Sequence, residues 1–421
     1  MHAKGVPATA ITSVSTTSEV TMKKNIGLIA LLLALGCARD AVVHAQTTSL
    51  HHYDIRADQL PSPFATGSAV NPPRVVSQPG GARLQVPPGF SISVYASGLD
   101  DPRHMIQAPN GDVIVSEPGA GKITILRNGK TYTFARGLND PYGLAILDGW
   151  LYIGDEDAVV RLPYTPGATR ATSEPQRIVP LPPGGHSTRG IVFNRNGTKM
   201  YVSVGSASNV SAGEPAERAA ILELNPDGTG KRIFASGLRN PIGMDWEPTT
   251  GALWTAVNER DGLGDELVPD YITDVHAGAF YGWPYAYIGQ HEDPRRRGER
   301  RDLVARTIVP ALLIQSHSAP LGIAFYEGNM FPAEYRSCAF VALHGSWNRS
   351  RRTGYKIIRV PFRNGRPSGG YDDFVVGWMP DEQSRAVWGR PVDLLVLRDG
   401  SLLISDDGGE KVWRVTYSGA R

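Results

Sequence analysis

Short apolar runs separated by turn residues fill the chain from Pro87 onward. Residues 98–126 contain a proline, an apolar run, an Asn-Gly turn, a second run ending in Ser-Glu, a glycine and a final run. Residues 389–417 repeat this order with Asp-Gly at the turn. These dipeptides between apolar runs are typical of β-hairpins, because they tolerate the positive φ of tight turns. The pattern predicts a recurring antiparallel unit.

The unit occurs in six copies. The remaining four occupy residues 137–164, 187–209, 237–261 and 318–350. No window sustains a helical i, i+3, i+4 apolar stripe beyond two turns, and 47 glycines and 32 prolines interrupt the chain at short intervals. Six units of three or four short strands predict an all-β six-bladed β-propeller of antiparallel four-stranded blades over residues 87–421, rather than a sandwich or an up-and-down barrel.

The first 86 residues lie outside this pattern. Residues 1–45 read as an over-extended start followed by a secretory signal peptide, with a lysine pair, an apolar stretch from Ile26 to Leu35 and a small-residue cleavage site. Cys37 permits lipoprotein anchoring as a less favoured alternative. Residues 46–86, rich in Pro, Ser and Gly, predict an extended lead that wraps or precedes the propeller.

Composition narrows the classes of partner. The chain has 421 residues, is 41% hydrophobic and carries a formal net charge of +2, so we expect a sizeable core and no nucleic-acid partner. The apolar stretch of the leader is too short for a transmembrane helix, so we expect an exported mature chain, periplasmic or secreted, without a membrane span. Of two cysteines, only Cys338 would remain, as a buried small hydrophobic residue.

A propeller brings distant residues together. The inner strand of each blade starts at the central channel, so residues near the Pro-X-Gly element of each copy should meet there. The expected channel residues are Arg103, His104, Tyr142, His186, Arg189, Arg239, Asn240, His317, Trp388 and Arg390. Converging arginines repel one another and lose hydration, which favours a multiply anionic ligand. For any single arginine, pairing with a carboxylate such as Asp265, Asp406 or Asp407 is the alternative.

Three short stretches carry candidate chemistry. His186 in "PPGGHSTRGI" is either a catalytic base facing a cavity or a polar surface residue. The charged, glycine-containing stretch "NERDGLGDE" is a candidate Ca²⁺-binding site, although it lacks the EF-hand pattern. In "HGSWNRS", His344, Trp347 and Arg349 combine a titratable group, a stacking platform and a cation; the alternative is an aromatic plug with solvated neighbours.

Several motifs together resemble a known family. "GGHSTRG", "FASGLRNPIGM", "NERDGLGDE", "YGWPY", "HSAPLGIAFY", "HGSWNRS" and "VWGRPVDLL" are similar, in order, to the glucose/sorbosone dehydrogenase family, exported six-bladed propellers that use pyrroloquinoline quinone (PQQ). The resemblance covers about Pro87 to Tyr417 and is strongest to the L-sorbosone dehydrogenase branch. It implies PQQ and Ca²⁺ as cofactors, a sugar or sugar aldehyde as substrate, and an external quinone or cytochrome as electron acceptor.

The resemblance also implies roles for individual residues. His186 matches the general base that takes the substrate hydroxyl proton while hydride passes to the quinone. Arg239 and Asn240 match the pair at the reactive carbonyl edge, Arg390 matches a carboxylate-binding arginine, and Arg349 lies near a cofactor-binding lysine of the relatives. The backbone carbonyls of Arg260 and Asp261 match the Ca²⁺-binding turn, with Asp265 close by. The remaining cofactor-binding candidates are His317, Trp388 and Asp406.

Departures from the family pattern leave alternatives open. Ser206 stands where the soluble glucose dehydrogenases orient their histidine with an aspartate, and Val392 replaces a second carboxylate-binding arginine. Residues 206–211 lack the Cys-x-x-Cys of many sorbosone-branch members. A Ca²⁺-dependent propeller lactonase or esterase, and a non-catalytic propeller that binds a partner or glycan, remain the competing hypotheses.

Overall fold

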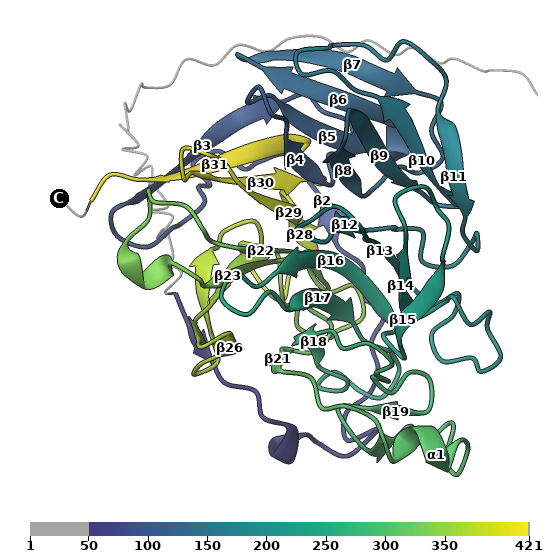
Figure 1. Cartoon of the computed structure of the whole chain (residues 1–421). Coiled ribbons are helices and arrows are strands. Elements are labelled where there is room, and N and C mark those ends of the chain that lie inside the picture. The colour runs from purple at the N-terminus through teal and green to yellow at the C-terminus, as the bar shows by residue number, and fades with distance from the viewer. Residues whose placement is uncertain (1–49, 420–421) are drawn as a thin grey trace, which may run out of the picture. The chain divides into compact units, whose positions relative to one another are not determined.

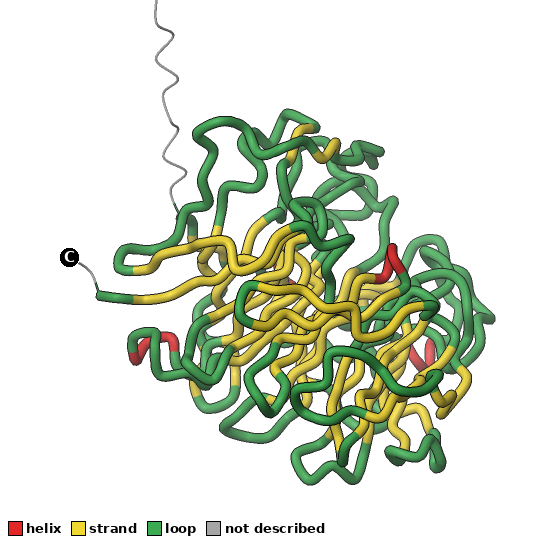
Figure 2. Tube along the Cα trace, turned by 90° about the horizontal axis from the view of Figure 1, so that it is seen from above, coloured by secondary structure: helices red, strands yellow, loops and turns green. Residues whose placement is uncertain are grey.

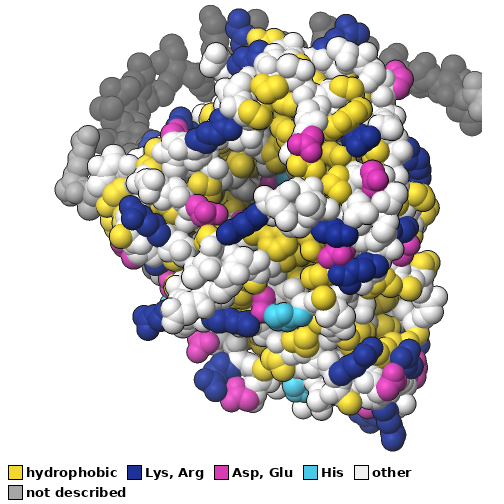
Figure 3. Space-filling view, viewed as in Figure 1, with side chains coloured by type: hydrophobic (Ala, Val, Ile, Leu, Met, Phe, Trp, Pro, Cys, Tyr) yellow, Lys and Arg dark blue, Asp and Glu magenta, His cyan; other side chains and the backbone are white. Residues whose placement is uncertain are grey.

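The computed structural model describes residues 50–419. Six antiparallel sheets follow one another along the chain and confirm the predicted six-bladed β-propeller of four-stranded blades. Figure 1 shows them in chain order, and Figure 2 shows the strands gathered in the interior with loops around them. On the face shown in Figure 3, basic and acidic side chains are interspersed, without a large patch of one sign.

Each blade has an inner strand followed outward by its partners. Blade 1 contains β4 (Met105–Gln107), β5 (Val113–Glu117), β6 (Lys122–Arg127) and β7 (Lys130–Arg136); blade 2 contains β8 (Leu144–Leu147), β9 (Trp150–Asp155), β10 (Ala158–Pro163) and β11 (Gln176–Pro180); blade 3 contains β12 (Ile191–Phe193), β13 (Met200–Val204), β14 (Ala220–Leu224) and β15 (Arg232–Ser236). Blade 4 contains β16 (Asn240–Trp246), β17 (Leu253–Asn258), β18 (Asp270–Asp274) and β21 (Leu312–Ile314); blade 5 contains β22 (Pro320–Phe325), β23 (Ala339–Leu343), β24 (Lys356–Val360) and β27 (Tyr371–Val375).

Blade 6 joins the two ends of the propeller. It contains β29 (Pro391–Val396), β30 (Leu402–Asp406) and β31 (Lys411–Tyr417), and its outermost strand is β3 (Phe90–Ser97) from the start of the domain. The β3–β31 register runs from Phe90 opposite Tyr417 to Ser97 opposite Lys411. Because early and late strands share one sheet, the ring of blades is closed by main-chain hydrogen bonds.

The recurring Pro-X-Gly element brings neighbouring inner strands into contact. A Cβ on Gly143 would lie 2.4 Å from the Arg189 carbonyl oxygen of the next blade, and a Cβ on Gly243 would lie 2.3 Å from that of Leu321. Only glycine permits this approach. At the corresponding point of blade 6, Asp393 accepts a 2.8 Å hydrogen bond from the Met105 backbone N–H and so connects blade 6 to blade 1.

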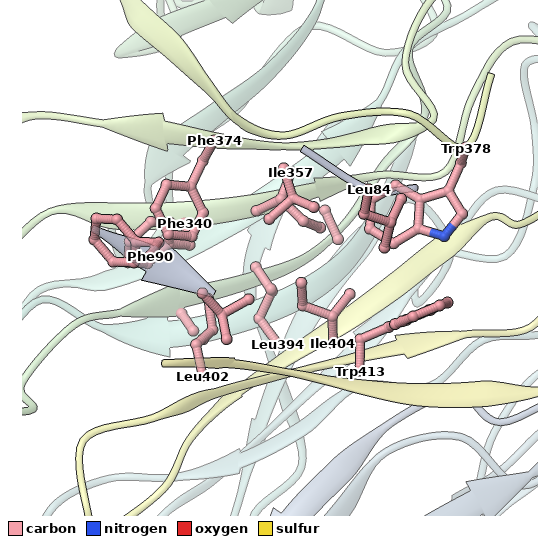
Figure 4. Packing of buried hydrophobic residues seen from close by; sticks show 14 of the residues in the cluster. Leu84, Phe90, Phe340, Ile357, Phe374, Trp378, Leu394, Leu402, Ile404 and Trp413 are labelled. Atoms are coloured by element: carbon pink, nitrogen blue, oxygen red, sulfur yellow. The ribbon is translucent and has the colours of Figure 1, made fainter. Parts of the chain in front are cut away.

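Apolar side chains fill the spaces between adjacent blades. Figure 4 shows the contact between blades 5 and 6, where Phe340, Ile357 and Phe374 face Leu394 and Ile404. All five side chains are buried. Burial of this kind at each blade boundary is the main favourable contribution to folding. Cys338 is buried as expected.

The lead packs against the propeller. Its strand β1 (His52–Tyr53) pairs with β27 as a fifth strand of blade 5, and β2 (Arg74–Val75) pairs in parallel with β28 (Ala386–Val387). Between them, Asn71 bonds a loop of blade 5: its N–H donates to the Trp347 carbonyl at 2.7 Å, and its side-chain amide donates to the Arg349 carbonyl at 3.0 Å. The lead therefore holds loops at the mouth of the channel.

The remaining elements are short. An insertion between β18 and β21 carries β19 (Ala286–Tyr287), β20 (His291–Glu292) and α1 (Arg301–Val304), and β25 (Phe362–Arg363) pairs with β26 (Arg366–Pro367). Three 3₁₀ turns occupy Ala57–Gln59, Pro118–Ala120 and Ala333–Tyr335. Within residues 50–419, none of the helices has the length and apolar character that crossing a membrane requires. The signal peptide and Cys37 lie outside the described residues.

Gly243→Ala tests the inner-strand contact. We expect a lower free energy of unfolding by about 1–3 kcal/mol, because the new methyl group would overlap backbone of the neighbouring blade. Gly67→Ala is the matched control, since a Cβ there meets nothing within 4 Å. Urea denaturation of both variants measures the difference, and equal midpoints would contradict the role given to Gly243.

Candidate active site

A cavity of about 380 Å³ lies at one end of the central channel. Its wall includes residues from the segments that lead into five of the six inner strands. One residue from each of these segments is Arg103, His186, Arg239, Ala319 and Arg390, in chain order. This volume is within the range of small-molecule sites. Topology therefore brings together side chains that are up to several blades apart in the sequence.

The cavity ends on an apolar layer. One buried cluster is formed by the residues that directly follow the prolines at four inner-strand entries, namely Tyr142, Ile242, Leu321 and Val392. Ile242 and Leu321 also line the cavity. The residues at the inner-strand entries therefore meet in this layer, as the sequence predicts. The layer closes the polar cavity on the channel side and lowers the local dielectric constant of the cavity.

His186 is held in one tautomer by the main chain. Its Nδ1 lies 2.7 Å from the carbonyl oxygen of Ser206, which also accepts the His186 backbone N–H at 3.1 Å. Because a carbonyl only accepts, Nδ1 carries the proton and Nε2 has the free lone pair. Nε2 makes no hydrogen bond to residues 50–419. The Ser206 carbonyl thus takes the place of an orienting carboxylate.

Burial keeps His186 neutral. Burial, and secondarily the charge of Arg239, lower the pKa of His186 to about 4, against the opposing effect of the Ser206 hydrogen bond. Arg189 is not a cavity residue; its guanidinium lies beneath this loop and donates to the carbonyls of His186 at 2.6 Å and Pro182 at 2.9 Å. The imidazole is consequently fixed in position and available as a base near neutral pH.

Three arginines line the cavity, and they differ in whether a carboxylate neutralises their charge. Arg103 forms a 2.8 Å ion pair with Asp407, and Arg239 forms a 3.2 Å ion pair with Asp261. Arg390 forms no ion pair with the described part of the chain; its guanidinium bonds the carbonyl oxygens of His344, at 3.3 Å, and Gly345, at 3.5 Å, and lies 5.9 Å from the centroid of the Tyr355 ring. A half-buried cation without a carboxylate partner is costly, so this wall of the cavity is suited to an anionic ligand.

Asn209 connects Arg239 to the Asp261 turn. Its Oδ1 accepts from the Asp261 N–H at 2.9 Å and from Arg239 at 3.2 Å, and its Nδ2 donates to the Asp261 carbonyl at 2.9 Å. The Asp261 carboxylate also accepts a 2.6 Å hydrogen bond from Asn348. These bonds fix the guanidinium and the carboxylate on the same side of the cavity.

Two further groups complete the wall. Asn240 lines the cavity, and its Oδ1 is buried without a hydrogen-bond partner among the described residues. Trp347 is 46% exposed at the rim, and its main chain is held by Asn71 of the lead. An exposed indole beside a polar cavity is a suitable stacking surface for a flat ring.

Comparison with known proteins assigns the family. A model of the TrAA12-like family matches residues 84–278 and 292–418, which is more than half of the chain. The chain belongs to the TrAA12-like family. The chain is also 36% identical over 234 residues to an uncharacterized protein of Borreliella burgdorferi, covering 55% of this chain and 61% of that protein.

Other relatives of this TrAA12-like chain have named activities. A pyrroloquinoline quinone-dependent pyranose dehydrogenase of Coprinopsis cinerea is 26% identical over 285 residues, covering 56% of this chain and 37% of that protein. The chain therefore spans less than two thirds of the length of these curated relatives. A calcium structure of a Trichoderma reesei Carbohydrate-Active Enzymes Family AA12 protein has a TM-score of 0.69, with 20% identity, covering 83% of this chain and 99% of that one; at this identity it shows the shared fold.

The TrAA12-like fold brings some of the predicted site residues to the cavity and not others. Those on its wall are His186, Arg239, Asn240, Asp261, His317 and Arg390. His317 is buried, and both its ring nitrogens are engaged: Nε2 donates to the Gly264 carbonyl at 2.9 Å, and Nδ1 accepts from Asn348 at 3.2 Å. It supports the Asp261 side of the wall.

Five predicted residues lie elsewhere. Trp388 packs in the core with Nε1 donating to the Gly377 carbonyl at 2.7 Å. Asp406 is buried against two indoles, accepting from Trp378 at 2.7 Å and from Trp413 at 2.9 Å. Its other oxygen accepts the Arg390 backbone N–H, so it supports the site from behind.

The other three belong to the Asp261 loop and its surroundings. Arg260 is fully buried in ion pairs with Glu259 at 2.9 Å and Asp293 at 3.2 Å. Asp265 bonds Ser350, and its N–H donates to Thr66 of the lead at 2.8 Å. Arg349 bonds Glu266 and the Asp265 carbonyl. These contacts direct all three side chains away from the cavity.

The predicted Ca²⁺ turn does not present a ready cage. The Asp261 carbonyl already accepts from Asn209 at 2.9 Å and from Arg295 at 2.8 Å. Across residues 50–419, no group of three His, Cys, Asp or Glu side chains could hold a metal ion. A hard cation at this wall would need oxygens supplied by a ligand, so the turn by itself does not fit the role.

Arg390→Ala tests the anionic character of the ligand. We expect at least a tenfold weaker affinity for a tricarboxylate ligand such as PQQ, because the cation without an internal partner is removed, while the melting temperature stays within a few degrees. Isothermal titration calorimetry measures the affinity. Arg177→Ala, which breaks an exposed ion pair with Asp157 on blade 2, is the control. Equal affinities of the two variants would contradict the assignment.

Proposed function

We propose that this chain is an oxidoreductase that uses PQQ to oxidise a sugar or a sugar aldehyde. The observation that carries the proposal is the convergence of Arg103, Arg239 and Arg390 on one cavity, where Arg390 has no ion pair within residues 50–419. A ligand with several carboxylates suits a cavity wall lined by guanidinium groups from three blades. The PQQ-dependent pyranose dehydrogenase among the relatives supports the same cofactor.

The residues present fit this cofactor. Arg103 and Arg390 would hold carboxylates on one side, Arg239 would donate to the ring oxygens, and Trp347 would cover the ring plane. When bound, the quinone supplies a two-electron acceptor for oxidation of a C–H bond. A calcium ion shared with the ligand's own oxygens is part of the proposal, supported by the calcium structure of the relative and not by a side-chain cage here.

The tautomer of His186 leaves Nε2 free to accept a proton, which defines its role in the proposed reaction. The substrate hydroxyl would donate to the free Nε2, and its proton would move to the imidazole as the adjacent C–H bond is oxidised. The Ser206 carbonyl keeps Nδ1–H in place and stabilises the imidazolium that forms. The apolar layer beneath excludes water from the far side of the reacting groups.

Substrate, location and acceptor complete the proposal. The sugar is an aldose or a sorbosone-type aldehyde, the protein acts after export, in the periplasm or outside the cell, and an external quinone or cytochrome reoxidises the cofactor. The resemblance of the motifs to exported sugar dehydrogenases supports these three statements.

Reconstitution tests the function. Purified apo-protein is incubated with PQQ and Ca²⁺, and reduction of an artificial electron acceptor is followed with a panel of aldoses and sorbosone. We expect activity that depends on both the quinone and a sugar. Absence of quinone binding, or quinone-independent hydrolysis of sugar lactones by the same preparation, would contradict the proposal and favour a lactonase.

His186→Ala separates chemistry from binding. We expect kcat to fall by about 10²–10⁴, the usual contribution of a positioned base, while the dissociation constant for PQQ changes less than threefold. Steady-state kinetics and calorimetry measure the two effects. Unchanged turnover would remove His186 from the mechanism.

The pH profile gives an independent test of the base. Because burial lowers the pKa of His186 to about 4, the neutral form that can accept a proton is complete above about pH 5 and is lost as the pH falls through 4. We expect kcat/KM to have its acidic limb near that value. A limb at pH 6.5, the ordinary histidine pKa, would show that the base is another group or is solvated.

A further inference from the structure

A second histidine of the cavity is held differently from His186. The Nε2 of His344 lies 2.8 and 3.0 Å from the two carboxylate oxygens of Asp407. Arg103 and His344 both hold the pKa of Asp407 well below its usual range despite its burial. The carboxylate is therefore ionised and can only accept, so Nε2 carries the proton of the neutral imidazole and Nδ1 has the lone pair.

This Nδ1 is available at the cavity. His344 lines the cavity, and its Nδ1 forms no hydrogen bond with residues 50–419. The residue is buried, its N–H donates to the Ala319 carbonyl at 2.9 Å, and its carbonyl accepts from Arg390 at 3.3 Å. The main chain of His344 is thus fixed from both sides, and Asp407, which pairs with its ring, also pairs with Arg103 at 2.8 Å.

The charges that face His344 are unbalanced without a ligand. Arg103 and Arg390 are cationic, and Asp407 is the nearest anion; Asp101 lies 3.6 Å from Arg103, and burial raises its pKa. Burial and Arg390 lower the pKa of His344 to about 4, so the imidazole is neutral at pH 7 before a ligand binds. A ligand carboxylate at Nδ1 would add the negative charge that the imidazolium needs.

We propose that His344 is a proton-linked anchor for a carboxylate of the ligand: on binding, Nδ1 takes one proton from the solvent and the resulting imidazolium bridges the ligand carboxylate and Asp407. The net reaction adds one proton and one ligand to the protein and leaves all covalent bonds of the ligand intact. This rests on the proposed function, because it requires a ligand with carboxylates.

His186 does not share this property. Behind its ring stands a carbonyl, whereas Asp407 places a full negative charge behind His344. A carboxylate stabilises an imidazolium more strongly than a neutral carbonyl does. The two histidines therefore have different roles. His344 becomes charged as the ligand binds, whereas His186 stays neutral and can accept a proton from the substrate.

Calorimetry in several buffers tests the proton count. PQQ is titrated into apo-protein at pH 7 in phosphate, MOPS and Tris, and the dependence of the enthalpy on the buffer's ionisation enthalpy gives the protons taken up. The ligand carboxylates are ionised at this pH. We expect about one proton per ligand for the wild type, near zero for His344→Gln, and about one for the matched control His186→Gln.

A second measurement does not depend on a variant that folds. For the wild type, the dissociation constant should rise with pH by up to about tenfold per unit between about 4, the pKa of His344 before binding, and its higher pKa in the complex, because binding takes up a proton only in that range. Circular dichroism verifies that the variants are folded.

The outcomes distinguish the two proposals. Binding of the quinone without proton uptake by the wild type, or uptake that is lost in His186→Gln and kept in His344→Gln, overturns the anchor alone. No binding of the quinone under any condition overturns the proposed function, and the anchor with it.

Discussion

The close approach of neighbouring inner strands is the contact on which the rest of the structure depends. At Gly143 and Gly243, the next blade's carbonyl oxygen occupies the place that any side chain would need. Asp393 replaces the glycine in the last blade and bonds the first blade instead. Because the inner strands lie so close together, the residues just before them also lie close together. Polar side chains that are far apart in the sequence therefore line one cavity.

Within that cavity, the hydrogen-bond and ion-pair partners of each arginine and histidine determine its charge and its availability to a ligand. Arg103, Arg239 and Arg390 are chemically alike, yet two are paired with carboxylates and one is not. The two histidines differ in the same way, since a carbonyl orients His186 and a carboxylate orients His344. A base that must stay neutral and a cation that must form on binding can therefore lie in one site.

The repeat and the entry positions could be predicted because both are local signals. Asn-Gly or Asp-Gly turns recur in four of the blades, each inner strand begins at or shortly after a proline or glycine, and the propeller topology then places His186, Arg239 and Arg390 at the channel. Side-chain direction is not local: Trp388 and Asp406 lie next to Arg390 in the fold but point into the blade. Asp265 and Arg349 are turned outward by contacts with each other's loops and with the lead, which has no periodic pattern. Asn209 acts on Asp261, 52 residues away, and nothing near it in the sequence indicates that pairing.

A crystal structure of the protein soaked with PQQ and Ca²⁺ tests the central claim most directly, namely that the convergent arginines hold a multiply anionic quinone. The account predicts the quinone in the cavity with carboxylates on Arg390 and Arg103, the ring beneath Trp347, and Nε2 of His186 free toward the remaining space. A quinone bound elsewhere, or a cavity in which a rearranged protein carboxylate pairs with Arg390 and no quinone enters, would contradict it.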